Sequence, residues 1–227
     1  MNNIKHIFFD LDHTLWDFDR NSEFAFKVIF QKHKISVPLP EFFKAYKPIN
    51  LGYWKLYQEN KISKIDLRRK RFSDTFTACN QKISLDVIDL LAEDYITHLP
   101  DNNYLIKGSV ELLDYLKSKY KLHIITNGFR EIQNKKLKKS GIYSYFDSVT
   151  NSEDAGVKKP HPGIFAHALK MAKANAEQSV MIGDNYEADI LGAKAYGLKT
   201  IFFNYHGEKS ALNEDCVFDL LSIKNQL

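Results

Sequence analysis

The sequence has few cysteines and no long apolar run. Its two cysteines, Cys79 and Cys216, are far apart and form no CxxC motif. This excludes a disulfide framework and a cysteine-based zinc site, so a reducing, cytoplasmic location is expected. No apolar run approaches the roughly 18 residues that a membrane-spanning helix needs. The segment 1–9 is too short for a signal peptide, so we expect no membrane partner.

A strong excess of charge of either sign is also missing. The chain carries 32 basic and 28 acidic residues, a net charge of +4. Such a balance fits an anionic ligand but is too small to predict a nucleic-acid partner. The length of 227 residues, with 44% hydrophobic residues, is enough for one large domain or for a core domain plus a smaller one. The sequence leaves a monomer and a homodimer equally open.

Short apolar runs alternate with helical patterns over much of the chain. Strands are expected at 4–9, 122–126, 148–150, 180–182 and 199–203. Helices are expected at 109–119, 130–140, 162–174 and 189–196. This alternation predicts the α/β class, with a Rossmann-like, doubly wound parallel sheet.

The segment from about residue 21 to residue 99 contains helical patterns and no convincing strand. Helices are expected to begin at Ser63 and Ser84, and breaks or interruptions are expected at Pro38, Pro40, Pro48 and Gly52. We therefore expect residues 1–16 and 102–227 to form the core, and residues 17–101 to form an inserted, all-helical domain.

Two carboxylates, Asp10 and Asp12, follow the first apolar run with one residue between them. In open α/β sheets, ligands bind at the carboxyl ends of the strands. Close carboxylates repel each other unless a cation lies between them or one of them keeps its proton. The pair therefore indicates a metal site, an acid/base site, or both.

Other polar clusters end or closely follow later strands, or precede a helix. They are Thr126 with Asn127, Lys158 and Lys159 before Pro160, and Asp184 with Asp189. The carboxyl ends of parallel strands share one edge of a sheet, so these clusters are expected to converge with the Asp10–Asp12 pair.

This set of residue types suits phosphoryl transfer through a covalent intermediate. Asp10 is the candidate nucleophile, and Asp12 is the candidate proton donor to the leaving group and acceptor from water. Mg²⁺ binds a few carboxylates and substrate phosphate oxygens, and Asp10 and Asp184 are the expected ligands. The backbone carbonyl of Asp12 would be a further ligand of the ion. Asp189 contacts the metal, holds a metal-bound water, or only supplies a negative charge at a helix start.

The remaining candidates would bind the phosphoryl group. Thr126 and the backbone amides of Asn127 and Gly128 can donate to its oxygens, and Lys159 can neutralise the charge that remains. Thr126 and Asn127 also suit a helix cap.

Four segments together resemble the motifs of the haloacid dehalogenase superfamily. They are Asp10-Leu11-Asp12-His13-Thr14, Ile125-Thr126-Asn127-Gly128, Lys159-Pro160-His161-Pro162 and Gly183-Asp184-Asn185-Tyr186-Glu187-Ala188-Asp189-Ile190. They occur in the superfamily's order. The helical insertion is similar to its small helical cap, and the interval from Asn127 to Lys159 is too short for the larger alternative cap.

The resemblance implies a Mg²⁺-dependent phosphatase that acts on a small-molecule phosphate ester. The segments 8–18 and 124–129 further resemble the bacterial 5′-nucleotidases that act on pyrimidine and non-standard nucleoside monophosphates. On that basis a nucleoside 5′-monophosphate is the expected substrate.

Three residues of the predicted cap are candidates for substrate binding: Asn50, Trp54 and Arg71. Helix packing is the alternative role for each. The basic runs 67–71 and 135–139 are interpreted as solvated helix faces, with Arg71 as the one arginine that would reach the substrate.

Several other functions stay open. A sugar-phosphate or phosphoglycolate phosphatase and a phosphomutase share the same chemistry. A dehalogenase needs neither Asp12 nor a metal. A regulator would bind a phosphate ligand without turnover; none of the charged motif positions that a degenerate protein would lose is missing here.

Overall fold

The computed structural model describes residues 3–207 and 216–227. The chain divides into two compact units. The sheet unit consists of Met1–Asp19 and Asn103–Leu227, and the helical unit consists of Arg20–Asn102.

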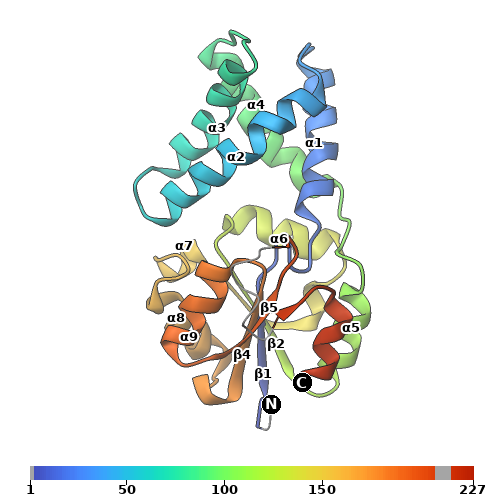
Figure 1. Cartoon of the computed structure of the whole chain (residues 1–227), viewed down its shortest axis with the longest axis vertical. Helices are drawn as coiled ribbons and strands as arrows, with labels where there is room; N and C mark the ends of the chain where they lie inside the picture. Colours follow the sequence, from blue (N-terminus) through green and yellow to red (C-terminus); the bar gives the residue numbers. More distant parts are fainter. Residues whose placement is uncertain (1–2, 208–215) are drawn as a thin grey trace. The chain divides into compact units, whose positions relative to one another are not determined.

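The sheet unit is built on six parallel strands in the order β3-β2-β1-β4-β5-β6 (Figure 1). The strands are β1 (His6–Phe9), β2 (Lys121–Thr126), β3 (Phe146–Asn151), β4 (Ser179–Gly183), β5 (Lys199–Phe203) and β6 (Cys216–Val217). The sequence indicated the first five, whereas β6 is too short to show a periodicity. The order reverses beside β1, the arrangement of a doubly wound sheet, and the predicted α/β fold is confirmed.

Strands β1, β2 and β4 end within two residues of one another. Phe9, the last residue of β1, pairs with Ile124 of β2 on one side and with Ile182 of β4 on the other. All three side chains are fully buried, which explains why these strands are continuous apolar runs. The register brings the residues that follow the strands to one edge of the sheet.

Helices cover both faces of this sheet. They include α5 (Ser109–Lys117), α6 (Arg130–Lys139), α7 (Ser152–Ala155), α8 (Pro162–Ala172), α9 (Gly192–Tyr196) and the 3₁₀-helix η6 (Leu220–Asn225). Helix α8 packs beside α9 on one face, and α5 packs beside η6 on the other (Figure 1). Phe165 and Ala168 of α8 meet Phe8 and Met181 of the sheet in one fully buried apolar cluster.

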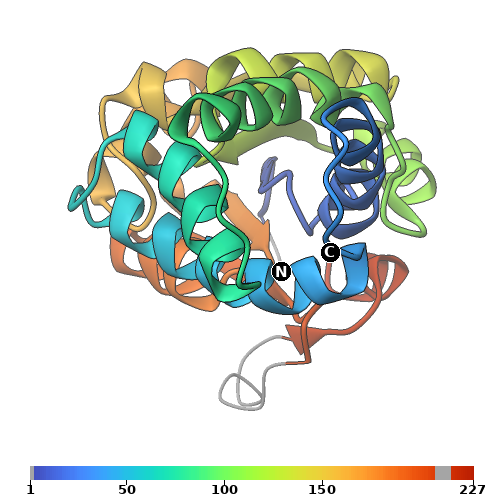
Figure 2. The same cartoon turned by 90° about the horizontal axis from the view of Figure 1, so that it is seen from above.

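The helical unit consists largely of four helices arranged around a common centre (Figure 2). They are α1 (Phe18–Lys32), α2 (Leu39–Gln58), α3 (Lys64–Ala78) and α4 (Leu85–His98). Each contributes an aromatic ring to the core. The Phe26 ring of α1 lies 4.9 Å from Phe42 of α2, 5.6 Å from Phe72 of α3 and 4.7 Å from Tyr95 of α4. Aromatic packing therefore holds this unit together.

Pro38 and Pro40 separate the first two helices as predicted: α1 ends at Lys32, Pro38 caps α2, and Pro40 lies in the first turn of α2. The predicted interruptions at Pro48 and Gly52 were wrong, because α2 continues through both. Proline is tolerated in a first turn, where the backbone N–H has no helical partner. Pro48 and Gly52 are both on the exposed face, so water can solvate the carbonyl that Pro48 leaves without a donor.

The helix expected at 189–196 begins earlier and has a different form. A π-helical turn, η4 (Tyr186–Leu191), precedes α9, and the Asn185 side chain caps it by accepting from the Ala188 N–H at 2.9 Å. The Asp189 side chain turns back to accept from the Asn185 N–H at 3.0 Å. Asp189 is thus inside a wide turn, and not at the start of a regular helix.

Within residues 3–207 and 216–227, no helix has the length and apolar character needed to cross a membrane. Cys79 and Cys216 are free thiols, as expected from their separation in the sequence.

Candidate active site

Asp10 directly follows β1 and forms an ion pair with Lys159. The Lys159 ammonium donates to Asp10 Oδ1 at 2.6 Å and to the Ile125 carbonyl at 2.7 Å, and it lies 2.6 Å from Asp189 Oδ1. Both Asp10 and Lys159 are buried, with 8% and 2% of their surface exposed. One cation therefore bridges two acidic side chains from different segments.

Three carboxylates converge beside this lysine. Asp10, Asp184 and Asp189 each offer an oxygen, and the three oxygens lie within 4.8 Å of one another. Gly183 makes this possible, because a Cβ atom at that position would lie 2.2 Å from Asp189 Oδ2. The Thr14 hydroxyl donates to Asp184 Oδ1 at 3.1 Å, so Thr14 orients one of the three acidic side chains.

The electrostatics of the cluster follow from burial and charge. Burial, together with the Asp189 and Asp184 carboxylates, raises the pKa of Asp10 against the opposing effect of Lys159. Burial also raises the pKa of Asp189. Burial alone would lower the pKa of Lys159, but the two adjacent carboxylates reverse this and raise it. The site thus keeps its lysine charged and favours a bound cation.

The predicted phosphate-binding residues form a tight turn after β2. The Asn127 side chain donates to the Lys159 carbonyl at 3.0 Å and accepts from the Lys159 N–H at 2.8 Å. Asn127 therefore fixes the backbone of the lysine segment. Thr126 is 2% exposed, and its Oγ1 accepts from the Gly128 N–H at 3.1 Å.

Asp12 is bound by two residues of α6 that the sequence interpretation did not include. Gln133 Nε2 donates to Asp12 Oδ2 at 2.9 Å and to Thr126 Oγ1 at 2.7 Å. Lys136 donates to Asp12 Oδ1 at 2.5 Å. A signal was present in the sequence, because helical periodicity places residues 133 and 136 on the face of the apolar Ile132 and Leu137.

Comparisons with known proteins identify the family of this chain. A profile described as haloacid dehalogenase-like hydrolase matches residues 4–197, which contain the carboxylate cluster, Lys159 and the helical insertion. The chain belongs to the haloacid dehalogenase-like hydrolase family.

Two relatives of this haloacid dehalogenase-like hydrolase are similar over most of their length. Pyrimidine 5′-nucleotidase YjjG of Escherichia coli is 36% identical over 205 residues, which cover 88% of this chain and 86% of the relative. Pyrimidine 5′-nucleotidase PynA of Streptococcus pneumoniae is 31% identical over 226 residues, covering 98% and 93%.

A solved structure is also similar over its whole length. The HAD-hydrolase YfnB of Bacillus subtilis, bound to magnesium, superimposes with a TM-score of 0.88 and 27% identity, covering 100% of this chain and 99% of that one. These matches confirm the predicted superfamily and the prediction of a phosphatase-type enzyme.

The other predicted binding residues belong to the helical unit of this hydrolase. Arg71 on α3 is 2% exposed, and its Nη1 donates to Asn50 Oδ1 of α2 at 3.1 Å. The guanidinium lies 5.0 Å from the centre of the Tyr95 ring. Trp54 is partly buried, with its ring 5.8 Å from that of Tyr57. The structure thus brings Asn50 and Arg71 together within one unit.

The interpretation of the basic runs as solvated faces was wrong for Lys136, whereas Arg71 was the one residue of these runs expected to reach the substrate. Arg71 and Lys136 are each 2% exposed, whereas Lys70 and Lys135 beside them are exposed. The buried members lie on the helix faces that carry the apolar residues.

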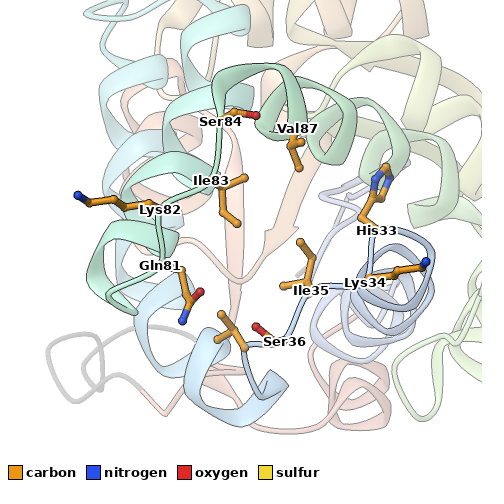
Figure 3. Close-up of a pocket in the computed structure, with 10 residues that line it drawn as sticks. His33, Lys34, Ile35, Ser36, Gln81, Lys82, Ile83, Ser84 and Val87 are labelled. Atoms are coloured by element: carbon orange, nitrogen blue, oxygen red, sulfur yellow. The ribbon is translucent and has the colours of Figure 1, made fainter.

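The helical unit also contains a pocket of about 280 Å³ between the segment after α1 and the segment before α4. Ile35, Ile83 and Val87 point toward one another inside it, and Lys34 and Lys82 point away (Figure 3). None of the predicted site residues lines this pocket.

Proposed function

We propose that this haloacid dehalogenase-like hydrolase is a Mg²⁺-dependent phosphomonoester hydrolase that forms a phosphoryl-aspartate on Asp10. The observation that carries the proposal is the convergence of Asp10, Asp184 and Asp189 beside the buried Lys159. A nucleophile, a set of oxygen ligands and a fixed cation are the parts that phosphoryl transfer needs.

In the first step, an Asp10 carboxylate oxygen attacks phosphorus, and the bond from phosphorus to the leaving oxygen breaks. Asp12, in its protonated form, gives its proton to that oxygen, so the alcohol leaves neutral. The product on the enzyme is an acyl phosphate at Asp10.

In the second step, water attacks phosphorus and gives a proton to the Asp12 carboxylate. The bond from phosphorus to the Asp10 oxygen breaks, inorganic phosphate is released, and Asp10 is again a carboxylate. Asp12 has then regained the proton that it gave in the first step, and the cycle balances.

The residues present fit Mg²⁺. The three acidic side chains offer only oxygen atoms and are buried, and Mg²⁺ prefers oxygen ligands. Asp10, Asp184 and Asp189, with the backbone carbonyl of Asp12, would hold the ion. When bound, it supplies positive charge that polarises the phosphoryl oxygens and opposes the rise in the Asp10 pKa.

The remaining groups of the site serve the phosphoryl oxygens. Lys159 neutralises their charge, and the Thr126 hydroxyl, whose oxygen accepts from the Gly128 amide, donates to them. Asn127 acts mainly through Lys159, whose backbone it holds by two hydrogen bonds. Buried donors of this kind are already oriented before substrate binds.

The proposed substrate class is a nucleoside 5′-monophosphate. Support comes from the two relatives, whose names describe pyrimidine 5′-nucleotidases. Residues 1–16 and 102–227 would act as the catalytic core and residues 17–101 as the cap, with Asn50, Trp54 and Arg71 binding the leaving group. Arg71 offers donors that suit the carbonyl oxygens of a base.

The other reactions that the sequence left open can each be distinguished from phosphate hydrolysis by one measurement. A mutase returns the phosphoryl group to a sugar phosphate and releases little free phosphate. A dehalogenase works in the presence of a chelator. A regulator binds phosphate ligands and releases none.

The direct test is a phosphate-release screen with Mg²⁺ over nucleoside monophosphates, sugar phosphates and phosphoglycolate. Preference for nucleoside monophosphates, with loss of activity in EDTA, is the expected result. A preference for sugar phosphates would remove the nucleotide assignment but keep the chemistry. Binding of Mg²⁺ is measured separately, as a rise in the melting temperature without substrate.

The nucleophile is tested by Asp10→Asn, which keeps the shape of the side chain. The variant should remain folded and lose hydrolysis, because an amide cannot form the acyl phosphate. Full activity in a folded Asp10→Asn protein would disprove the covalent mechanism.

A further inference from the structure

Lys136 is a charged side chain in a place where an apolar one would fit. Only 2% of it is exposed, and its ammonium lies 4.2 Å from the Trp16 ring centre and 5.2 Å from the Phe18 ring centre. Aromatic faces attract a cation, but this attraction compensates only part of the free energy that is needed to remove the ammonium from water. The ion pair of Lys136 with Asp12 at 2.5 Å compensates for the rest.

A contribution to folding stability does not explain why Lys136 and Asp12 form an ion pair here. Replacing a buried ion pair by packed apolar residues is often neutral or stabilising. The partner of Lys136 is Asp12, the residue to which the proposed reaction assigns both proton transfers.

The Asp12 carboxylate is held from two sides. Lys136 donates to its Oδ1, and Gln133 donates to its Oδ2 at 2.9 Å. Gln133 is itself 1% exposed and fixed by Thr126. Each carboxylate oxygen has two lone pairs, so both keep one for a further proton or hydrogen bond. The two α6 residues therefore set the direction of the carboxylate and leave one lone pair on each of its oxygens available.

We infer that Lys136, together with Gln133, is a positioning residue that aims the Asp12 carboxylate at the leaving oxygen. Neither α6 residue needs to touch the substrate. This inference rests on the proposed function, because it takes Asp12 as the acid and base. It gives α6, the helix that follows the Thr126–Asn127 turn, a role in orienting the acid and base.

The first measurement compares two leaving groups. Lys136→Met is assayed with an alkyl phosphate that the wild-type enzyme hydrolyses and with p-nitrophenyl phosphate. Departure of an alkoxide needs a proton, whereas p-nitrophenolate leaves without one. The second step, in which Asp12 acts on both substrates alike, enters kcat but not kcat/KM, which ends with departure of the leaving group. Since general acid catalysis contributes about 10²–10⁴-fold, kcat/KM for the alkyl phosphate should fall at least about tenfold more than kcat/KM for the aryl phosphate.

Three comparisons separate positioning from packing. Lys135→Met removes the same charge from an exposed position one residue earlier and should leave both kcat values unchanged. Lys136→Arg keeps a cation and should recover most of the alkyl phosphate activity. KM should change little in Lys136→Met, because Lys136 is placed behind Asp12 and not against substrate. Melting temperatures show that each variant is folded.

A double-mutant cycle completes the test. If Lys136 acts through Asp12, then Lys136→Met should cause no further loss of kcat/KM in an Asp12→Asn background. Equal losses of kcat/KM on both substrates, or additive losses in the cycle, would overturn the positioning role. Wild-type alkyl phosphate activity in Asp12→Asn would instead overturn the acid and base assignment of the proposed function, and this inference with it.

Discussion

The ammonium of Lys159, a residue only 2% exposed, lies 2.6 Å from Asp10 Oδ1. The same ammonium lies 2.6 Å from Asp189. One residue thus compensates two buried carboxylates, at the place where a divalent cation is proposed to bind. Stability and activity of this hydrolase should therefore depend on the same lysine.

Lys159→Met should destabilise the protein by about 3–5 kcal/mol in EDTA, because it leaves uncompensated carboxylates in the interior. Mg²⁺ should restore part of this loss, since the metal can compensate the same charges. Hydrolysis should fall at least about 100-fold even with Mg²⁺, because a fixed donor to the phosphoryl group is gone. Urea unfolding with and without Mg²⁺ measures the first effect and phosphate release the second.

Lys158→Met is the control for this experiment, since it removes a lysine from the preceding, less buried position. It should change stability by less than about 1 kcal/mol. A Lys159→Met protein as stable in EDTA as the wild type would contradict the bridging role.

Gly128 and Gly52 make a second matched pair. A Cβ atom on Gly128 would lie 2.3 Å from Gln133 Nε2, whereas one on Gly52 would meet nothing within 4 Å. Gly128→Ala should cost about 1–3 kcal/mol, because Gln133 must give up its bonds to make room. Gly52→Ala, in the exposed middle of α2, should stabilise by about 0.5–1 kcal/mol. Denaturant unfolding measures both, and equal changes would contradict the role of Gln133.

The sequence predicted the fold class and the place of the site for a physical reason. Strands buried on both faces are continuous apolar runs, and polar residues that end such runs must lie at the sheet edge. Asp10 and Asp184 could be found in this way because each directly follows a strand, and Lys159 because it lies shortly before α8.

The residues that the sequence did not assign depend on contacts between distant segments. Lys136 in a lysine-rich run has the composition of a solvated face, and its partner Asp12 is 124 residues away. The π-helical turn around Asp189 depends on the side-chain bond to the Asn185 N–H. Pro48 was misread because a proline disrupts a helix only where its environment cannot solvate the free carbonyl.

Arg71 gives a prediction about substrate choice. Among the residues that the structure describes, its buried Nε and Nη2 atoms have no hydrogen-bond partner. Unsatisfied buried donors are costly, and a ligand oxygen would satisfy them. If Arg71 binds the leaving group, Arg71→Met should lower kcat/KM for a nucleoside monophosphate about 10- to 100-fold. It should change kcat/KM for p-nitrophenyl phosphate much less.

Arg69→Met is the matched control on the same helix. Arg69 is 42% exposed and pairs with the equally exposed Asp89, and such surface ion pairs contribute little. Its removal should leave both substrates unaffected. The same loss on both substrates in Arg71→Met would show that Arg71 supports only the packing of the helical unit.

His123 on β2 is a buried imidazole within a short polar chain. Its Nδ1 is 2.8 Å from Ser148 Oγ, its Nε2 is 3.0 Å from His6 Nδ1, and its ring stacks on Phe8. Burial first, and then His6, Lys117 and Lys121, lower the pKa of His123 from 6.5 to about 4, while Asp147 acts in the opposite direction.

Stability should therefore fall in acid through His123. The unfolded chain takes up a proton as pH falls below 6.5, whereas the folded protein takes it up only near pH 4. The stabilisation from the neutral ring is complete above the first value and is lost as pH falls to the second, a difference of about 3 kcal/mol. His123→Gln keeps a polar group for Ser148 and cannot ionise, so its free energy of unfolding should decline less steeply between these two pH values. Urea unfolding at a series of pH values measures the two slopes, and identical slopes would show that His123 does not resist protonation in the folded state.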